Sequence, residues 1–169
     1  PVNEPLLDGN EKKYLNECIE TGWISSEGPF VKKFEKQFSK KVNREFGISV
    51  SSGTAALEIA VRALGIGPSD EVILPAFTII ACAAAIVKAR ATPVLVDADP
   101  ITWNMDVNTI EDLITSKTKA IMAVHLYGNP CDLNRLVKLC KKHNLFLIED
   151  AAEAFGSYYN KQHVGTIGD

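Results

Sequence analysis

Leu145-Phe146-Leu147-Ile148-Glu149-Asp150-Ala151-Ala152-Glu153-Ala154 is the stretch of this chain that decides the fold. Four apolar residues in a row predict a buried strand, and Asp150 places a carboxylate at its carboxyl end. Upstream, Val50-Ser51-Ser52-Gly53-Thr54-Ala55-Ala56-Leu57 predicts a turn of small residues that opens a helix. An α/β sheet binds an aromatic phosphate cofactor with such a pair of segments. The two segments therefore predict contacts to the two ends of one ligand.

Short apolar runs alternate with helical patterns from Phe46 onward. We expect strands at residues 46–50, 71–74, 93–96, 119–124 and 145–148. We expect helices at residues 54–64, 78–89, 107–114 and 132–143, with Asp106 and Asp132 as N-caps. Apolar strands separated by helices are typical of a mostly parallel sheet with helices on both faces. The expected fold class is therefore α/β.

The carboxyl ends of the strands are expected to form one rim, because ligands of such sheets bind where the strand-to-helix loops gather. The rim would collect residues 51–54, 75–78, 97, 125–128 and 150.

The first 43 residues have a different pattern. Residues 11–19 and 30–41 predict amphipathic helices, and Phe30, Phe34 and Phe38 follow the i, i+4 spacing of a core-facing stripe. Between the helices, residues 22–29 form a loop that carries Trp23, a candidate for function. We therefore divide the chain into a helical segment with a candidate substrate loop, residues 1–43, and the first part of a larger domain, residues 44–169.

Composition narrows the class of partner. The chain has 169 residues, 46% of them apolar and 23% charged, which is enough for one folded core. A net charge of −3 without basic clusters gives no basis for nucleic-acid or membrane binding, so a small-molecule partner is favoured.

The four cysteines form no zinc spacing and no disulfide framework, which favours a reduced, cytoplasmic location. The uncharged run 72–87 is too short to span a membrane. Pro1 is an unusual first residue, which suggests that further residues precede it in the protein.

Each candidate site residue has a functional and an ordinary interpretation. Small polar residues before Thr54 and Ala55 could present backbone amides to a phosphate, or could be a plain N-cap. Asp150 could pair with the ring nitrogen of pyridoxal phosphate, or could cap a helix or form a salt bridge. Glu153 could face the same cavity and contact the ring hydroxyl, or could lie on a solvated helix face.

The remaining candidates are weaker. Phe77 could cover a cofactor ring, although a core phenylalanine is commoner. His125 and Tyr127 also follow a strand. A core histidine that caps a loop is the favoured interpretation of His125, and neither residue is assigned to catalysis. No serine stands in a nucleophile elbow, and the sequence is neither a P-loop nor a dinucleotide-binding motif.

These residues resemble the DegT/DnrJ/EryC1/StrS group of sugar aminotransferases, which have the fold type I, aspartate aminotransferase-like architecture. The resemblance covers essentially the whole chain and rests on six segments in this order: GWISSEG (22–28), SGTAAL (52–57), DEVILPAFT (70–78), PVLVD (93–97), AVHLYG (123–128) and IEDAAEA (148–154). Residues 4–11 and 21–26 are most similar to the branch that aminates GDP-linked 4-keto-6-deoxymannose to a 4-amino sugar for surface polysaccharide such as lipopolysaccharide O-antigen.

The resemblance implies a pyridoxal 5′-phosphate enzyme that uses glutamate as amino donor and works as a homodimer. By position it implies Gly53, Thr54 and Ala55 at the cofactor phosphate, Asp150 at the ring nitrogen and Glu153 near the ring hydroxyl. Phe77 and Ile79 would lie at the ring, and Trp23 and Ser25 at the substrate. No metal is implied.

Two departures from the group accompany the resemblance. Position 79, commonly aromatic in the group, is Ile79 here, so ring coverage would fall to an aliphatic contact or to Phe77. The Schiff-base lysine of the group lies beyond Gly168-Asp169, so we expect the chain to be truncated before this lysine and the small domain, and to be inactive alone. Two alternatives stay open: a nucleotide-sugar 3-dehydratase of the same fold, and a truncated, non-catalytic cofactor-binding domain.

Overall fold

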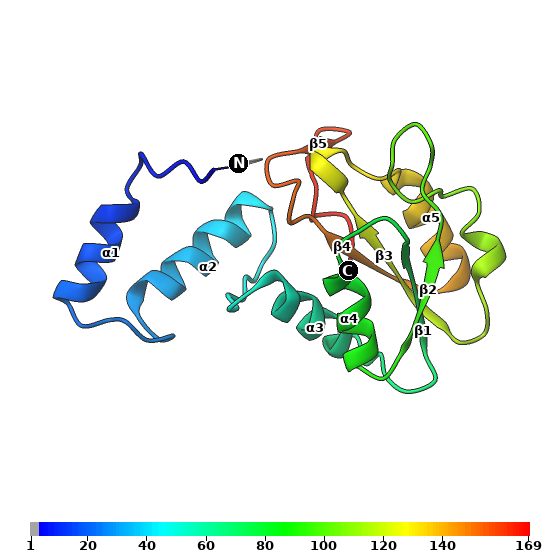
Figure 1. Cartoon of the computed structure of the whole chain (residues 1–169), viewed down its shortest axis with the longest axis horizontal. Coiled ribbons are helices and arrows are strands. Elements are labelled where there is room, and N and C mark those ends of the chain that lie inside the picture. Colours follow the sequence, from blue (N-terminus) through cyan, green and yellow to red (C-terminus); the bar gives the residue numbers. More distant parts are fainter. Residues whose placement is uncertain (1–3) are drawn as a thin grey trace. The chain divides into compact units, whose positions relative to one another are not determined.

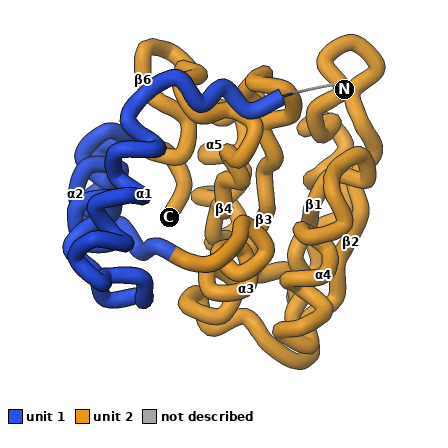
Figure 2. The backbone as a smooth tube through the Cα atoms, turned by 60° about the vertical axis from the view of Figure 1, so that its left-hand side comes forward, with its two compact units in different colours: residues 1–49 blue, residues 50–169 orange. Residues whose placement is uncertain are grey.

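The computed structural model describes residues 4–169. They form two compact units, one extending to Ser49 and the other from Val50 to Asp169 (Figure 2). The functional boundary that we drew at residues 43 and 44 stays a prediction. Each unit is described by itself below.

The first unit contains the helices α1 (Glu11–Glu20) and α2 (Pro29–Lys41). Pro29 begins α2 because its missing amide hydrogen is no loss in the first turn of a helix. The ring centroids of Tyr14 and Phe30 lie 5.2 Å apart. Our expectation that the phenylalanine stripe of α2 is buried was wrong in this unit, because Phe34 is 55% exposed and Phe38 is 40% exposed.

The second unit is built on a parallel sheet of four strands, β1 (Glu71–Pro75), β2 (Thr92–Val96), β3 (Thr118–Val124) and β4 (Phe146–Asp150) (Figure 1). Their order is β2-β1-β3-β4, and every neighbouring pair is parallel. The four predicted strands from residue 71 onward are therefore confirmed. All four carboxyl ends point toward the same edge.

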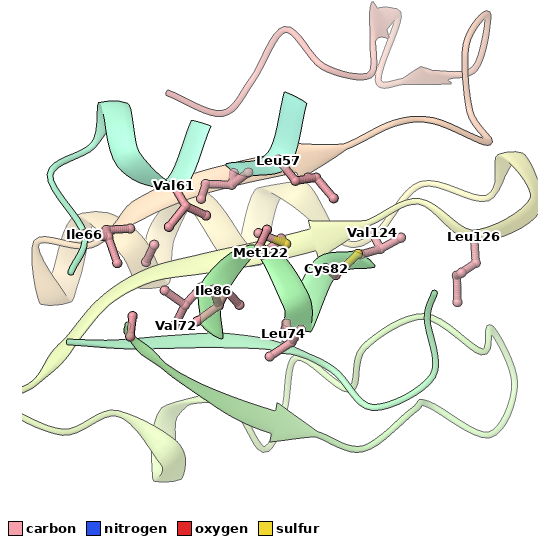
Figure 3. Close-up of a cluster of buried hydrophobic side chains, with 14 residues drawn as sticks. Leu57, Val61, Ile66, Val72, Leu74, Cys82, Ile86, Met122, Val124 and Leu126 are labelled. Atoms are coloured by element: carbon pink, nitrogen blue, oxygen red, sulfur yellow. The ribbon is translucent and has the colours of Figure 1, made fainter. Parts of the chain in front are cut away.

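Helices cover both faces of this sheet. On one face, α3 (Gly53–Ala63) and α4 (Ile80–Lys88) bury Leu57, Cys82 and Ile86 against the side chains of β1 and β3 (Figure 3). On the other face, α5 (Leu133–His143) buries Leu133 and Leu136 in a second cluster. Asp132 caps α5 as predicted, because its Oδ1 accepts a hydrogen bond from the Arg135 amide at 3.2 Å.

Two predicted elements are absent. Residues 46–50 form no strand, because no described strand pairs with them, and Phe46 and Ile48 are 77% and 75% exposed. Residues 107–114 contain only the short 3₁₀ turn η1 (Glu111–Leu113). Asp106 caps a turn instead of a helix, since its Oδ1 accepts from the Asn108 amide at 3.0 Å.

Three short elements were not predicted. They are the 3₁₀ turn η2 (Leu126–Gly128) and the hairpin of β5 (Tyr158–Tyr159) and β6 (Gln162–His163). Within residues 4–169, no helix is long and apolar enough to cross a membrane.

Candidate functional site

The strand β4 ends in two carboxylates that point to opposite faces of the sheet, because successive side chains of a strand alternate. Ile148 belongs to the cluster under α3 and α4, whereas Leu147 belongs to the cluster under α5. Asp150 therefore shares the face of α3 and α4, and Glu149 shares the face of α5. Asp150 and Glu149 therefore have different surroundings and different roles.

Asp150 lies at the rim with both oxygens in contact with the chain. Its Oδ1 accepts the amide hydrogen of Ala152 at 3.1 Å. Its Oδ2 lies 3.3 Å from the thiol of Cys82 on α4. Neither partner is a cation, and no basic side chain of residues 4–169 forms a salt bridge with this carboxylate, so its negative charge is available to a positively charged ligand.

Glu149 is enclosed by hydrogen-bond donors. Its oxygens accept from the amides of Gly165, Ile167 and Gly168 at 2.8, 2.8 and 2.6 Å, and His125 Nε2 lies 3.0 Å away. Burial alone would raise the pKa of this carboxyl, but the hydrogen bond from His125 and the three amides lower the pKa to about 2. Glu149 therefore ties residues 165–168 to β4 and is a structural group.

His125 is the core histidine that the sequence favoured. Its side chain is fully buried, and its Nδ1 accepts the amide hydrogen of Cys131 at 3.1 Å. Because Nδ1 accepts, the ring proton lies on Nε2 and is donated to Glu149. The imidazole therefore links the loop after β3 to β4.

The start of α3 presents free backbone amides. Ser52 is its N-cap, and its Oγ accepts from the Ala55 amide at 3.2 Å. Within residues 4–169 the amides of Gly53 and Thr54 have no acceptor, and a Cβ added at Gly53 would meet no atom within 4 Å. The N-terminus of α3 can therefore accept an anion, which the helix dipole favours. Ala55 differs from the expectation because its amide already has a partner.

The start of α3 and Asp150 lie on the same face of the sheet. Leu57, one turn into α3, packs in one cluster with Cys82 and Val124 (Figure 3). The Cys82 thiol in turn contacts Asp150. Val124 is the last residue of β3, so this contact is at the carboxyl end of the strands. The structure therefore places the two segments that the sequence selected on one face of the sheet.

The loop after β1 contributes the candidate ring-covering residues. Phe77 is 40% exposed, and its ring centroid lies 5.4 Å from that of Trp103 in the loop after β2. Ile79 is 67% exposed and precedes α4. Both predicted side chains therefore lie open at the rim, and Trp103 is an unpredicted aromatic residue beside Phe77.

Glu153 joins two loops of the rim. It lies in a turn and not on a helix, and its Oε2 accepts the amide hydrogen of Tyr127 at 2.8 Å. Tyr127 has a left-handed backbone with φ of 50°, and the Ser157 hydroxyl donates to the Gly128 carbonyl at 2.8 Å. Buried Asn104 bonds the same loop, donating to the Asn129 carbonyl at 2.9 Å. The loops after β2, β3 and β4 are therefore fastened together.

Trp23 and Ser25, the candidate substrate residues, belong to the first unit. They line an apolar hollow of about 330 Å³ together with residues of α1 and α2. Trp23 is 49% exposed, and its Cβ lies 3.2 Å from where a Cβ on Gly28 would be, so a larger residue at position 28 would crowd Trp23. Their role stays a prediction.

Sequence reasoning missed Cys82 and Trp103. Cys82 follows Thr78 by four residues at the start of a predicted helix, so the pattern places both on one helix face. Nothing in the sequence indicates that this face meets Asp150, because that contact depends on how α4 packs on the sheet. Trp103 lies in a loop that the sequence does not place.

The fold is that of an α/β protein with an open parallel sheet, and free amides at one helix start and a carboxylate at a strand end are groups that can bind a phosphate-bearing, cationic ligand. The chain belongs to the DegT/DnrJ/EryC1/StrS aminotransferase family, whose model matches residues 5–169.

Curated relatives cover the whole chain. It is 53% identical over 169 residues to GDP-perosamine synthase of Escherichia coli O157:H7, covering 100% of this chain and 46% of the relative. It is 50% identical over 168 residues to GDP-perosamine synthase of Caulobacter vibrioides, covering 99% of this chain and 45% of the relative. The chain thus spans less than half the length of these relatives.

Solved structures confirm the expected fold. The putative sugar aminotransferase Spr1654 from Streptococcus pneumoniae in its PLP form matches with a TM-score of 0.91 and 36% identity, covering 98% of this chain and 46% of that one. An E. coli GDP-4-keto-6-deoxy-D-mannose-3-dehydratase with bound hydrated PLP matches with a TM-score of 0.92 and 28% identity, covering 99% of this chain and 44% of that one.

Proposed function

We propose that this chain is the cofactor-binding part of a pyridoxal phosphate-dependent aminotransferase. The complete protein would convert a nucleotide-linked 4-keto-6-deoxy sugar, GDP-4-keto-6-deoxymannose, to the 4-amino sugar, with glutamate as donor. The observation that carries the proposal is the position of Asp150, a rim carboxylate without a cation, on the same sheet face as the free amides of α3.

The donor set fits this cofactor at both ends. The free amides of Gly53 and Thr54 suit a phosphate, and the open space beside Gly53 lets a guest approach the backbone. The Asp150 carboxylate suits a protonated pyridine nitrogen. When bound, the cofactor supplies an electron sink for moving an amino group.

The side chains of this chain would hold the cofactor ring in place and keep its nitrogen protonated. Asp150 would keep the proton on the ring nitrogen. Phe77 and Ile79 would lie at the ring faces, where their exposed side chains are available. Within residues 4–169 the Oε2 of Glu153 accepts from the Tyr127 amide and its Oε1 makes no hydrogen bond, so Oε1 could accept from the ring hydroxyl.

The substrate is inferred from the relatives. Identity to the GDP-perosamine synthases reaches 53%, whereas it is 28% to the dehydratase structure. This difference supports transfer of an amino group over removal of a hydroxyl. Analysis of the product with ¹⁵N-labelled glutamate separates the two, because only amino transfer leaves the glutamate nitrogen in the sugar product. Product without incorporated nitrogen would favour the dehydratase.

We also infer that the complete protein is a cytoplasmic homodimer that serves surface polysaccharide synthesis, with Trp23 and Ser25 at the substrate. The exposed apolar side chains of the first unit, such as Ile24 at 82%, support a further contact surface. Equilibrium sedimentation of the complete protein tests the dimer, and a monomer at all concentrations would contradict it.

Asp150→Asn in the complete protein tests the assignment. The change keeps the shape but removes the charge, so we expect turnover to fall roughly 100-fold or more, as when one preorganised electrostatic group is lost. Folding should be little affected, which circular dichroism checks. Asp112→Asn, at an exposed position of η1, is the matched control. Unchanged turnover in Asp150→Asn would refute the proposal.

A further inference from the structure

Cys82 is fully buried in the first turn of α4, yet its sulfur faces two polar groups. Its Sγ lies 3.3 Å from Asp150 Oδ2 and 3.5 Å from the hydroxyl oxygen of Thr78. Thr78, Cys82 and Asp150 therefore form a chain of three polar groups that runs from the loop after β1 to the end of β4. This chain lies on the face of the sheet that carries the candidate site.

The proton positions in this chain follow from the chemistry of the groups. Burial raises the pKa of the Cys82 thiol to about 11, and the charge of Asp150 acts in the same direction, so the sulfur keeps its proton at neutral pH. An ionised carboxylate only accepts hydrogen bonds, so the S–H donates to Oδ2. The Thr78 hydroxyl is then left to donate to the sulfur.

Both oxygens of Asp150 are consequently fixed. The Ala152 amide holds Oδ1, and the thiol holds Oδ2. Without Cys82, nothing in residues 4–169 bonds Oδ2, and the carboxylate could rotate about its side-chain torsions.

We propose that Cys82 is a positioning residue that orients Asp150 toward the ring nitrogen of the cofactor. This inference rests on the proposed function, since it needs Asp150 to bind that nitrogen. A thiol is a weak donor, so it fixes the carboxylate while leaving more negative charge on it than a hydroxyl or an amide would. Thr78 acts in turn on the sulfur and keeps its S–H directed at Asp150.

Substitutions in the complete protein test the role. Cys82→Ala removes the donor, and we expect the dissociation constant for pyridoxal phosphate to rise on the order of 3- to 10-fold, the effect of one lost hydrogen bond. Cys82→Ser keeps a donor at the same place and should restore much of the affinity. Absorbance titration of the apoprotein with pyridoxal phosphate measures both.

Cys140→Ala is the matched control. Cys140 is also buried, but it belongs to the cluster under α5 on the opposite face of the sheet. Its removal makes a cavity of the same size without touching Asp150. We expect this variant to bind the cofactor like the wild type.

An infrared measurement on the apoprotein supplies a readout that does not depend on the loaded enzyme. The S–H stretching band of Cys82, identified as the band lost in Cys82→Ala, should lie at lower frequency than that of a free thiol. It should move to higher frequency in Asp150→Asn, because a neutral amide oxygen is a weaker acceptor than a carboxylate. A band that does not respond to Asp150→Asn would overturn the proposed contact.

The affinities separate failure of this inference from failure of the proposed function. If Asp150→Asn weakens cofactor binding but Cys82→Ala behaves like Cys140→Ala, the positioning role is wrong and the cofactor site stands. If Asp150→Asn leaves cofactor binding unchanged, the proposed function itself is wrong, and the inference falls with it. A loss in Cys82→Ala that Cys82→Ser does not restore would assign the effect to packing and overturn the role.

Discussion

Two neighbouring acids, Glu149 and Asp150, show how much one residue of register matters. The alternation of a strand sends Glu149 into a nest of amides and leaves Asp150 at an open rim. Sequence reasoning selected Asp150 as a candidate site residue, because a carboxylate after four apolar residues needs a partner. It could not predict the enclosure of Glu149, because its donors come from residues 165–168, whose path the sequence does not indicate.

Acid should weaken the structure through Glu149. The pKa of this carboxyl, lowered to about 2 by its hydrogen bonds, lies below its ordinary value of 4.5 in an unfolded chain. Its contribution to folding, on the order of 3 kcal/mol, is therefore fully present above pH 4.5 and is lost as the pH falls toward 2. Urea unfolding at a series of pH values measures this loss.

Glu149→Gln serves as the comparison for that experiment. The variant should be less stable at neutral pH and should lack this part of the acid dependence. Hydrogen exchange should also become faster at the amides of Gly165, Ile167 and Gly168, which lose their carboxylate. Parallel stability curves for variant and wild type would show that the carboxylate does not have this role.

At the scale of elements, sequence patterns predicted the helices and strands that local residue types determine. They failed where an element needs a partner elsewhere in the chain. The strands from residue 71 onward and the N-cap Asp132 follow from apolar runs and capping residues, and both are confirmed. Residues 46–50 have the alternation of a strand but no described partner. Residues 107–114 have apolar residues at helical spacing, yet hydrogen bonds to Asp106 turn the chain after two residues. The candidate site was predictable by segment, but the contact between Asp150 and Cys82 depends on tertiary packing.

Replacing Gly53 in the first turn of α3 should have opposite effects on folding stability and on cofactor affinity. Alanine is a better helix former than glycine, and its Cβ would meet open space, so Gly53→Ala should stabilise the fold by about 0.5–1 kcal/mol. The same Cβ would obstruct the approach of a phosphate, so pyridoxal phosphate should bind more weakly. Thermal unfolding and cofactor titration together check both effects. Higher stability with unchanged affinity would remove Gly53 from the candidate site.

At the scale of the whole molecule, exposed apolar side chains are spread along the chain, and two of them, Phe46 and Ile48, stand at alternate positions near the end of the first unit. Phe46 and Ile48 are both more than 70% exposed in residues 4–169. Single exposed apolar residues are ordinary, but alternating ones on a segment that belongs to no described strand can pair with another chain.

Residues 1–169 alone should therefore self-associate in a concentration-dependent way. Ile48→Lys should reduce the association, because a charge discourages strand pairing. Ile101→Lys, at a solitary site that is 86% exposed, is the control and should leave it unchanged. Sedimentation velocity distinguishes these outcomes, and equal effects of the two lysines would point to net charge alone.

The contact between Phe77 and Trp103 has an optical consequence. The chain contains two tryptophans, Trp23 in the first unit and Trp103 in the second, so each unit carries its own fluorophore. Because the Trp103 ring lies against a residue of the rim, its emission in a Trp23→Phe background would report occupancy at that rim without any added dye. Trp103 is thus an intrinsic fluorescent probe of ligand binding at the carboxyl edge of the sheet.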